Sequence, residues 1–416
     1  MPSSISSSSA MGAVGETIVH SGFVRLTASD RPGVAQPVPE RDIPQRPWGP
    51  IWLGALIVSV LLLAAWEWHW RDFGAAPGYH NSDAQWVQQR RRIDNGEGGK
   101  TVLIGSSRVL FDVQLPVWEK FSGERPIQLA LEGTSAVLAM EDLAADKNFT
   151  GRLLIGVTPN LFFTGFAYRG NVFPYFHKQP PSDRSGLWIS QHLIEPWFAF
   201  YDSDFALDTV VRRLDWPERP GVPPRLQVRK LSVMEADRNT MMWQKVETDL
   251  AYRDIVRRTW AQNFTGPPPP ALDTLEKRQK VFNTQIDRAV KAAATLRARG
   301  VKMVFVRLPS AGDFYAFEQK AIPRELTWEP LLKRTGVAGI HFEDHPEMQG
   351  YELPEWSHLS AVEAKRMTAV LAPMVERKFQ AQDGAEINDR AAFTSTLDNL
   401  HSTQAAIPNP PRHRRE

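Results

Sequence analysis

The longest apolar run of the chain lies near its N-terminus. The residues between Arg46 and Glu67, PWGPIWLGALIVSVLLLAAW, carry no charge. A helix rises about 1.5 Å per residue, so this run covers the roughly 30 Å hydrocarbon core of a bilayer. Tryptophans gather at and beyond its ends, as in interfacial aromatic belts: Trp48, Trp52, Trp66, Trp68 and Trp70. The pattern predicts a transmembrane helix over residues 47–66 rather than a buried core helix, so the lipid bilayer is the first expected partner.

Charges beside the apolar run predict its orientation. Within about twenty residues of the run, the N-terminal side carries Arg31, Arg41 and Arg46, whereas the other side carries only Arg71. Because flanking positive charges stay in the cytoplasm, we expect a single-pass inner (cytoplasmic) membrane protein with a cytoplasmic N-terminus and a periplasmic or extracytoplasmic main domain. A cleaved signal peptide fits less well, since a long arm precedes the run.

Beyond the run, strand-like and helix-like patterns alternate. Short runs rich in aliphatic residues predict five strands, at residues 101–105, 126–131, 151–157, 301–308 and 339–342. Helical patterns cover residues 135–146, 274–299 and 361–380. This alternation predicts an α/β fold, a doubly wound parallel sheet with helices on both faces.

Other segments depart from that alternation. They are predicted to be a disordered cytoplasmic arm (1–46), a juxtamembrane linker or helix (67–99), a helical insertion (about 164–273) and a disordered tail (380–416). A structureless loop of the insertion's length would be unusual inside a domain, so we expect it to cover one end of the sheet as a substrate-shaping cap. The remaining α/β domain then spans residues 100–379.

Composition removes several classes of function. The 49 basic and 47 acidic residues nearly cancel, which gives no nucleic-acid signature. The short basic cluster at residues 90–92 is expected to form a solvated helix face. The chain has no cysteine, which excludes disulfides and thiolate chemistry. His341, Asp344 and His345 show no recognised metal spacing, and a solvated loop is expected there.

A glycine–serine turn is the first candidate for chemistry. Gly105, Ser106 and Ser107 directly follow the first predicted strand. Ligands of open parallel sheets bind beyond the carboxyl ends of the strands, and N–H groups at the start of the next helix can point at an anion. The alternative is that Ser106 or Ser107 only caps that helix.

A second candidate lies about 250 residues downstream, in PEWSHLSAVEAKRM. Glu355 and His358 are three residues apart, and Ser360 is a suitable cap for the last predicted helix. A carboxylate and an imidazole at this spacing in a tight turn can hydrogen bond, which fixes the tautomer of the histidine. A serine nucleophile needs a histidine arranged in this way.

Together these two motifs resemble the SGNH (GDSL-like) hydrolases and acyltransferases. The first block of that family, Gly-Asp-Ser or Gly-Ser-Ser, matches residues 105–107 and implies that Ser107 is the nucleophile. Its last block, Asp-x-x-His followed by Leu, matches residues 355–359 and implies that His358 is the general base. The family has Asp as its acid, whereas this chain has Glu355, which is one methylene longer. The resemblance covers residues 100–163 and 300–376, and it implies a flavodoxin-like three-layer sheet.

The middle blocks of the family match less closely. LALEGTS offers Gly133 as the glycine whose N–H contributes to the oxyanion hole. The family's Gly-x-Asn-Asp block corresponds to GVTPN, where Asn160 stands four residues after Gly156 instead of two. Asn160 is therefore either an oxyanion donor or an ordinary turn residue.

The chain is similar in style to membrane-anchored members that serve alginate O-acetylation and teichoic-acid D-alanylation. This resemblance implies a serine esterase or O-acyltransferase that acts on an ester-bearing envelope or secreted glycan, together with a membrane acyl-donor partner. No metal or organic cofactor is expected. The alternative is a non-catalytic SGNH-like protein that binds glycans or partners in a membrane assembly.

Overall fold

A five-stranded parallel sheet forms the centre of the computed structural model, which describes residues 46–212 and 230–405. Its strands are β1 (Thr101–Ile104), β2 (Ile127–Gln128), β3 (Arg152–Gly156), β6 (Lys302–Arg307) and β7 (Ala338–His341). They lie in the order β2-β1-β3-β6-β7, and each neighbouring pair is parallel. Four of these strands fall within the predicted runs, and β7 begins one residue before its run at 339–342. The α/β class and the parallel sheet are therefore confirmed.

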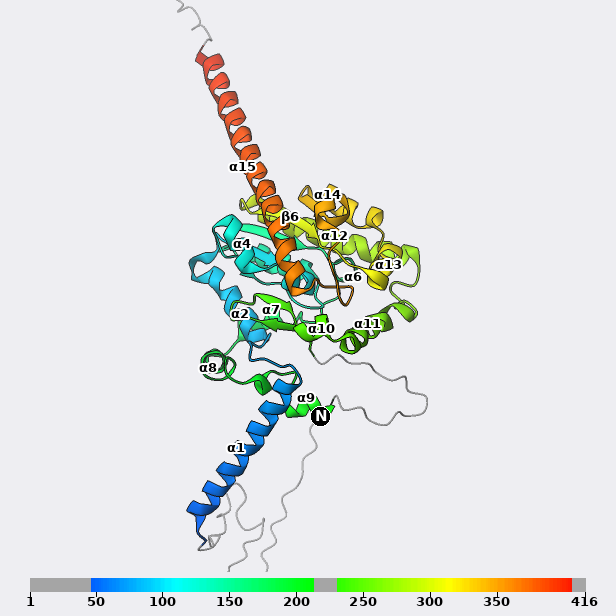
Figure 1. The fold of residues 1–416 in the computed structure, drawn as a ribbon. Helices are drawn as coiled ribbons and strands as arrows, with labels where there is room; N and C mark the ends of the chain where they lie inside the picture. Colours follow the sequence, from blue (N-terminus) through cyan, green and yellow to red (C-terminus); the bar gives the residue numbers. More distant parts are fainter. Residues whose placement is uncertain (1–45, 213–229, 406–416) are drawn as a thin grey trace, which may run out of the picture. The chain divides into compact units, whose positions relative to one another are not determined.

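Helices cover both faces of this sheet (Figure 1). Side chains alternate along each strand, so Val102 and Ile104 join one hydrophobic cluster while Leu103 joins the other. The first cluster is completed by α2 (Asp83–Arg92), α5 (Ala136–Ala145), α12 (Leu275–Ala298) and α14 (Trp328–Thr335). The second is completed by α3 (Ser107–Asp112), α4 (Leu115–Ser122) and α15 (Ala361–Ala405). The result is the three-layer arrangement that alternating strands and helices favour.

The predicted helix starts rest on side-chain caps. The Ser135 hydroxyl accepts from the N–H of Val137 at the start of α5, and the Thr274 hydroxyl accepts from Lys277 at the start of α12. The end of α15 differs from the prediction, because the helix continues past residue 380 to Ala405. No proline interrupts the chain between residues 374 and 405, so nothing there breaks the helix. The rest of the predicted tail, 406–416, and the arm up to residue 45 lie outside the described residues.

The insertion between β3 and α12 is largely helical, as predicted. After α6 (Pro159–Phe162), its helices are α7 (Val172–Lys178), α8 (Pro181–Ile189), α9 (Leu207–Arg212), α10 (Gln244–Thr248) and α11 (Leu250–Thr265). It also contains an antiparallel pair that the pattern did not predict, β4 (Ser232–Met234) with β5 (Thr240–Met242). Three-residue strands are too short to produce a recognisable alternation. After β6, α13 (Gly312–Ala321) precedes α14.

The predicted membrane segment forms α1 (Trp48–Asp72). Among the described residues, α1 is the one helix long and apolar enough to cross a bilayer. It runs six residues beyond the predicted end at Trp66. These last turns carry aromatic side chains of the α/β unit's third hydrophobic cluster, in which Trp70 is 4% exposed and stacks on Phe205.

One residue of the 90–92 cluster corrects the prediction of a solvated face. Arg90 is only 1% exposed, and its guanidinium pairs with Asp142 and Asp146, each at 2.7 Å. The face of α2 that carries Arg90 is turned toward α5, whose carboxylates compensate for the lost hydration of the cation. Amphipathic periodicity does not reveal such a pair, because the partners lie about 50 residues away.

Two glycines set how closely α3 approaches the sheet. Gly105 follows β1 and Gly156 ends β3, and a Cβ atom added to either would overlap the side chain of Val109 in α3. The absence of both side chains lets the first turn of α3 pack directly over the ends of two strands. The position of the glycine–serine turn therefore depends on this contact.

We expect Gly156→Ala to lower the stability of the protein by about 1–3 kcal/mol, because the added methyl overpacks the contact with Val109. The measurement is the thermal denaturation midpoint of the full chain in detergent. Gly186→Ala in α8 is the matched control, since no atom lies within 4 Å of its added Cβ. Val109→Ala should lower the denaturation midpoint less in the Gly156→Ala background than in the wild type, because it removes the overlapping side chain. An equal loss in both backgrounds would contradict the overlap.

Candidate functional site

The candidate residues all follow strands of the sheet. The glycine–serine turn follows β1, Gly133 follows β2, Asn160 follows β3 and His358 follows β7. Because the strands are parallel, their carboxyl ends share one edge of the sheet, where ligands of such folds bind. Chain topology thus brings the candidates to the same edge.

The two serines of the turn have different surroundings. Ser106 is buried at the N-cap position of α3, but its hydroxyl makes no cap bond and instead lies 2.5 Å from Thr158 Oγ1. Ser107 is the first residue of α3 and is half-buried, and its hydroxyl has no hydrogen-bond partner within the described part of the chain. The structure thus does not support a capping role for Ser106, and of the two hydroxyls only that of Ser107 is without a hydrogen bond to a described residue.

Glu355 and His358 form a buried hydrogen-bonded pair. Glu355 Oε1 accepts from His358 Nδ1 at 2.7 Å and from the His358 backbone N–H at 2.6 Å. Neither residue is more than 2% exposed. The carboxylate selects the tautomer with the proton on Nδ1, which leaves the lone pair of Nε2 free. Nε2 is buried and has no hydrogen-bond partner among the residues that the structure describes.

The insertion holds the turn that carries this pair. Trp260 of α11 donates its indole N–H to Glu355 Oε2, and Arg257 Nε donates to the Pro354 carbonyl at 2.8 Å. Within the turn, Trp356 has a left-handed φ of 74°, a conformation that costs roughly 1–3 kcal/mol for a non-glycine residue. Its carbonyl accepts from the N–H of Ala311 after β6 at 2.8 Å. Contacts from two other elements therefore maintain the strained turn.

The imidazole packs against α3, the helix that Ser107 begins. The Phe111 ring stacks on the His358 ring with centroids 4.3 Å apart, and Asp112 Oδ1 accepts from the Leu359 N–H at 2.9 Å. Helix residues four apart share a face, so Ser107 lies one turn before Phe111 on the same side of α3. Among the described residues no hydrogen bond joins Ser107 to His358, although the His358 ring packs on Phe111, one turn after Ser107.

Gly133 and Asn160 are not joined to Ser107 by a hydrogen bond either, as far as the chain is described. Gly133 has a φ of 55°, and its carbonyl accepts from the Tyr168 N–H at 3.0 Å. Its own N–H makes no hydrogen bond to a described residue. Asn160 lies in α6, and its Oδ1 is buried without a hydrogen-bond partner. Both residues retain polar groups that the fold does not use.

Sequence reasoning missed several polar residues around the site. Arg108 follows Ser107 directly and is 1% exposed, and it pairs with Glu318 of α13 at 3.0 Å. Arg307, at the end of β6, pairs with the same carboxylate at 2.7 Å. Asp112 is completely buried near His358. In SRVLFD, residues 108, 111 and 112 lie on one side of a helix. This spacing was the available signal in the sequence, but the motif at residues 105–107 pointed only to Ser107.

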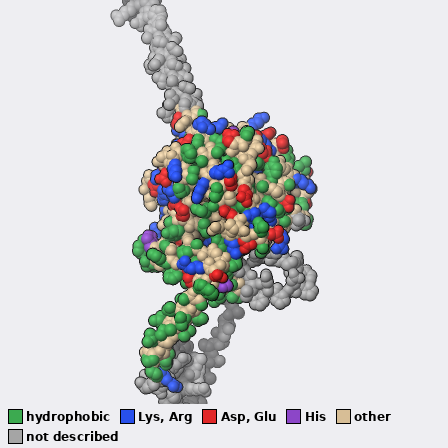
Figure 2. Space-filling view, in the orientation of Figure 1, with side chains coloured by type: hydrophobic (Ala, Val, Ile, Leu, Met, Phe, Trp, Pro, Cys, Tyr) green, Lys and Arg blue, Asp and Glu red, His purple; other side chains and the backbone are tan. Residues whose placement is uncertain are grey.

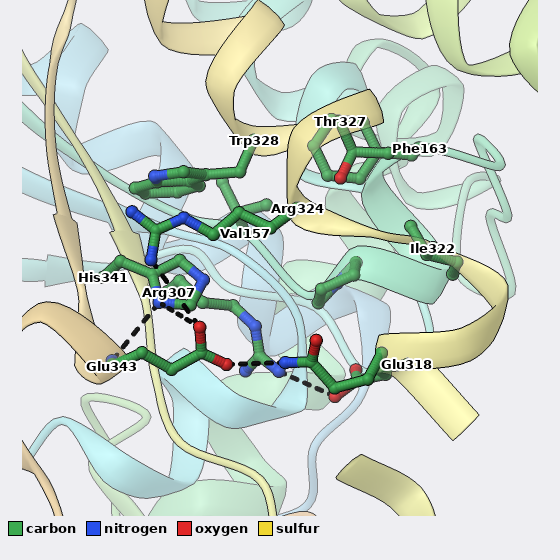
Figure 3. A pocket seen from close by; sticks show the side chains of 12 residues that line it. Val157, Phe163, Arg307, Glu318, Ile322, Arg324, Thr327, Trp328, His341 and Glu343 are labelled. Carbon is green, nitrogen blue, oxygen red and sulfur yellow. Dashed lines mark hydrogen bonds and ion pairs between the residues drawn. The ribbon is translucent and has the colours of Figure 1, made fainter. Parts of the chain in front are cut away.

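A small cavity lies beside this charged group (Figure 3). It measures about 20 Å³, which is enough for roughly one water molecule and too little for an organic substrate. His341 lines it and is 6% exposed, which corrects the expected solvated loop for this residue. Burial, together with the nearby charges of Arg307 and Arg324, lowers the pKa of His341 to about 3. Within the described ranges no group of side chains forms a metal site.

Phe111 lines a much larger cleft. Its volume is about 690 Å³. The residues lining it include Asn81, Asp83, Phe111, Glu132, Tyr168 and Arg169. Glu132 precedes Gly133, and Phe111 stacks on His358, so the cleft reaches the surroundings of two candidate residues. Charged and amide side chains dominate its wall, which suits a polar ligand.

Asp112 generates a pH-dependent prediction. Burial raises its pKa to about 7, although the charges of His358 and Arg108 and the Leu359 N–H act in the opposite direction. An ordinary aspartate titrates near pH 4 when unfolded. The protonated Asp112 carboxyl thus contributes fully to the stability of the folded protein below about pH 4. This contribution is lost as the pH rises to about 7 and the folded protein has to bury a charged carboxylate. Over that window the loss is on the order of 4 kcal/mol.

Asp112→Asn removes this titration while keeping an oxygen that accepts from Leu359. We expect the variant to gain stability relative to the wild type as the pH rises from 4.5 to 8. Denaturation midpoints of both full-length proteins at the two pH values test this. Asp254→Asn in α11, where the side chain is exposed, is the control. A difference between wild type and Asp112→Asn that stays constant with pH would contradict the buried, titrating carboxyl.

No family model matches the chain, and no curated protein matches it. Its function is therefore inferred from its own residues.

Proposed function

We propose that the protein is a membrane-anchored serine esterase or O-acyltransferase of the SGNH type. The observation that carries the proposal is the state of His358. Its Nδ1 is held by Glu355, its Nε2 is free, and its ring lies on the helix that begins with Ser107. This is the arrangement that activates a serine hydroxyl. The strand order, which is shared with flavodoxin-like sheets, supports the same family.

In the proposed reaction, Ser107 Oγ attacks an ester carbonyl while its proton moves to His358 Nε2. The carbonyl π electrons become the oxyanion, which accepts hydrogen bonds from the N–H groups of Ser107 and Gly133, with Asn160 as a third donor. Collapse of this intermediate breaks the ester C–O bond, and the departing alcohol takes the proton from His358. Water or a sugar hydroxyl then gives its proton to His358 Nε2 and attacks the acyl-serine carbonyl. As the acyl–Oγ bond breaks, Ser107 Oγ takes this proton from His358, which regenerates both residues.

The longer acid is compatible with this mechanism. The Glu355 side chain reaches forward three residues, so that one oxygen accepts from both the backbone and the ring of His358. Its second oxygen accepts from Trp260. With the extra methylene relative to Asp, the carboxylate therefore still orients the imidazole and can stabilise its cation.

The polar cleft is the proposed acceptor site for an ester-bearing envelope or secreted glycan. Aromatic faces and hydrogen-bonding side chains suit sugar rings, and Tyr168 is 74% exposed beside Glu132 and Arg169. We propose that α1 anchors the domain with the N-terminus in the cytoplasm. A membrane acyl-donor partner would then supply the acyl group when the acceptor is a sugar hydroxyl.

One observation favours the alternative, a non-catalytic glycan- or partner-binding protein. His358 is 2% exposed beneath Phe111, and its imidazole is not bonded to Ser107 in the described structure. A binding protein needs only the cleft. A catalyst must in addition bring the Ser107 hydroxyl within hydrogen-bond reach of His358 Nε2.

The full chain in detergent should hydrolyse p-nitrophenyl acetate, and Ser107→Ala and His358→Ala should each reduce kcat at least about 100-fold, since each removes a member of the triad. Ser122→Ala, at the far end of α4, is the matched control and should retain full activity. Turnover of wild type and variants, with folding checked by circular dichroism, is the measurement.

A fluorophosphonate probe identifies the nucleophile directly. The expected adduct maps to Ser107 by peptide mass spectrometry and is absent from His358→Ala. An adduct on Ser106 would assign the reaction to the neighbouring serine. No adduct, combined with background hydrolysis that the substitutions leave unchanged, would refute catalysis and leave the binding function.

Trp260→Phe should reduce kcat by roughly tenfold with little change in KM, because the indole donates to Glu355 Oε2 and positions the acid without touching substrate. Trp188→Phe, an exposed tryptophan of the insertion, is the control. In a double-mutant cycle, Trp260→Phe should have little further effect when Glu355 is already Gln. Additive losses would show that Trp260 acts on something other than the acid.

A further inference from the structure

The last turns of α1 are hydrogen bonded to the insertion. Both carboxylate oxygens of Glu67 accept backbone N–H groups, from Ala199 at 3.0 Å and Phe200 at 2.9 Å. Arg71 donates to the Trp197 carbonyl at 3.0 Å. The Trp66 indole donates to a carbonyl at residue 205 at 3.3 Å. These bonds tie residues 197–205 to the point where the apolar run of α1 ends.

Packing reinforces these bonds. Phe205 is fully buried and stacks on Trp70 with centroids 4.8 Å apart. The Trp243 ring contacts Phe205 edge-on and belongs to the same cluster. Lys230 pairs with Asp202 in the neighbouring turn, which keeps the segment folded onto α1. The segment therefore has a defined position relative to Trp66 and Glu67.

The same part of the insertion exposes large apolar side chains. We call this set the interfacial patch, and it consists of Trp188, Ile189, Leu193, Trp197, Phe198 and Leu207. Their exposed fractions range from 43% for Phe198 to 65% for Trp197. In the space-filling view, hydrophobic side chains cover the region where Figure 1 labels α8 (Figure 2). Contiguous apolar surface of this kind marks a contact with a membrane or a protein.

The position of the bilayer surface follows from the length of the apolar run. Residues 48–66 of α1 span roughly 28 Å at 1.5 Å per residue, so Trp66 marks one boundary of the hydrocarbon core. Glu67 begins the polar side. Residues bonded to Trp66 and Glu67 lie at the level of the lipid headgroups, where tryptophan side chains are favoured.

We propose that the interfacial patch inserts into the headgroup region of the bilayer that α1 spans. The domain would then have two attachments to the membrane, the anchor and the patch. Trp188 and Trp197 suit this environment because an indole offers an apolar body and one polar N–H. The inference rests on the anchor and the contacts of Glu67, and it does not depend on the esterase proposal.

The absence of native cysteine allows a direct test. Leu193→Cys in the full chain carries a nitrobenzoxadiazole fluorophore, and the protein is reconstituted into phosphatidylcholine vesicles with acyl chains brominated near the headgroup. We expect a blue-shifted emission and about a twofold loss of intensity relative to unbrominated vesicles, as for side chains buried 5–10 Å into the interface.

Two further positions calibrate the result. Leu61→Cys, within α1, should be quenched and reports correct reconstitution. Phe121→Cys is the matched control, since its side chain is 53% exposed but lies at the end of α4, next to the amino end of β2 at the opposite edge of the sheet. It should be unaffected.

An unquenched probe at residue 193, with Leu61→Cys quenched, would overturn the proposal. A blue shift at residue 193 that grows with protein density in unbrominated vesicles would also overturn the proposal, because the patch would then contact another copy of the chain.

Discussion

The buried hydrogen bond between Glu355 and His358 is the constraint on which the rest of the site depends. A carboxylate without exposure to water needs donors to offset its lost hydration, and Glu355 receives three, from the His358 backbone, the His358 ring and Trp260. Two of these donors require the strained turn around Trp356, and the third requires α11. The insertion is therefore part of the framework that holds Glu355 and His358 in place.

Local patterns predicted the framework of the fold well. The runs around Leu103 and Leu154 are short, aliphatic and followed by glycine, and both became central parallel strands. Ser135 and Thr274 stood where caps were needed. The sequence pattern does not predict the β4–β5 pair, because strands of three residues show too little alternation. It also does not predict the full length of α15, because the residues after 380 are polar, which is typical of disorder, yet they also favour a helix.

The candidate site was predictable only where its groups are close in sequence. Glu355 and His358 are three residues apart, so their hydrogen bond could be anticipated. The Trp260–Glu355 bond, the Arg108–Glu318 pair and the burial of Asp112 all depend on segments that are distant along the chain. Single-residue chemistry does not encode such contacts, because they arise only when the helices are packed.

The aromatic cluster at the end of α1 means that this domain has no clean boundary with its tether. Trp70 belongs to the same core as Trp243 and Tyr252, and Tyr252 lies in the first turn of α11, the helix that carries Trp260. Proteolytic release after the apolar run would leave those rings in place, whereas release a few residues later would remove Trp70 and open the core that supports α11. A soluble form of the protein would thus depend on where it is cut, and its fold would be intact only if the last turns of the anchor remained with it.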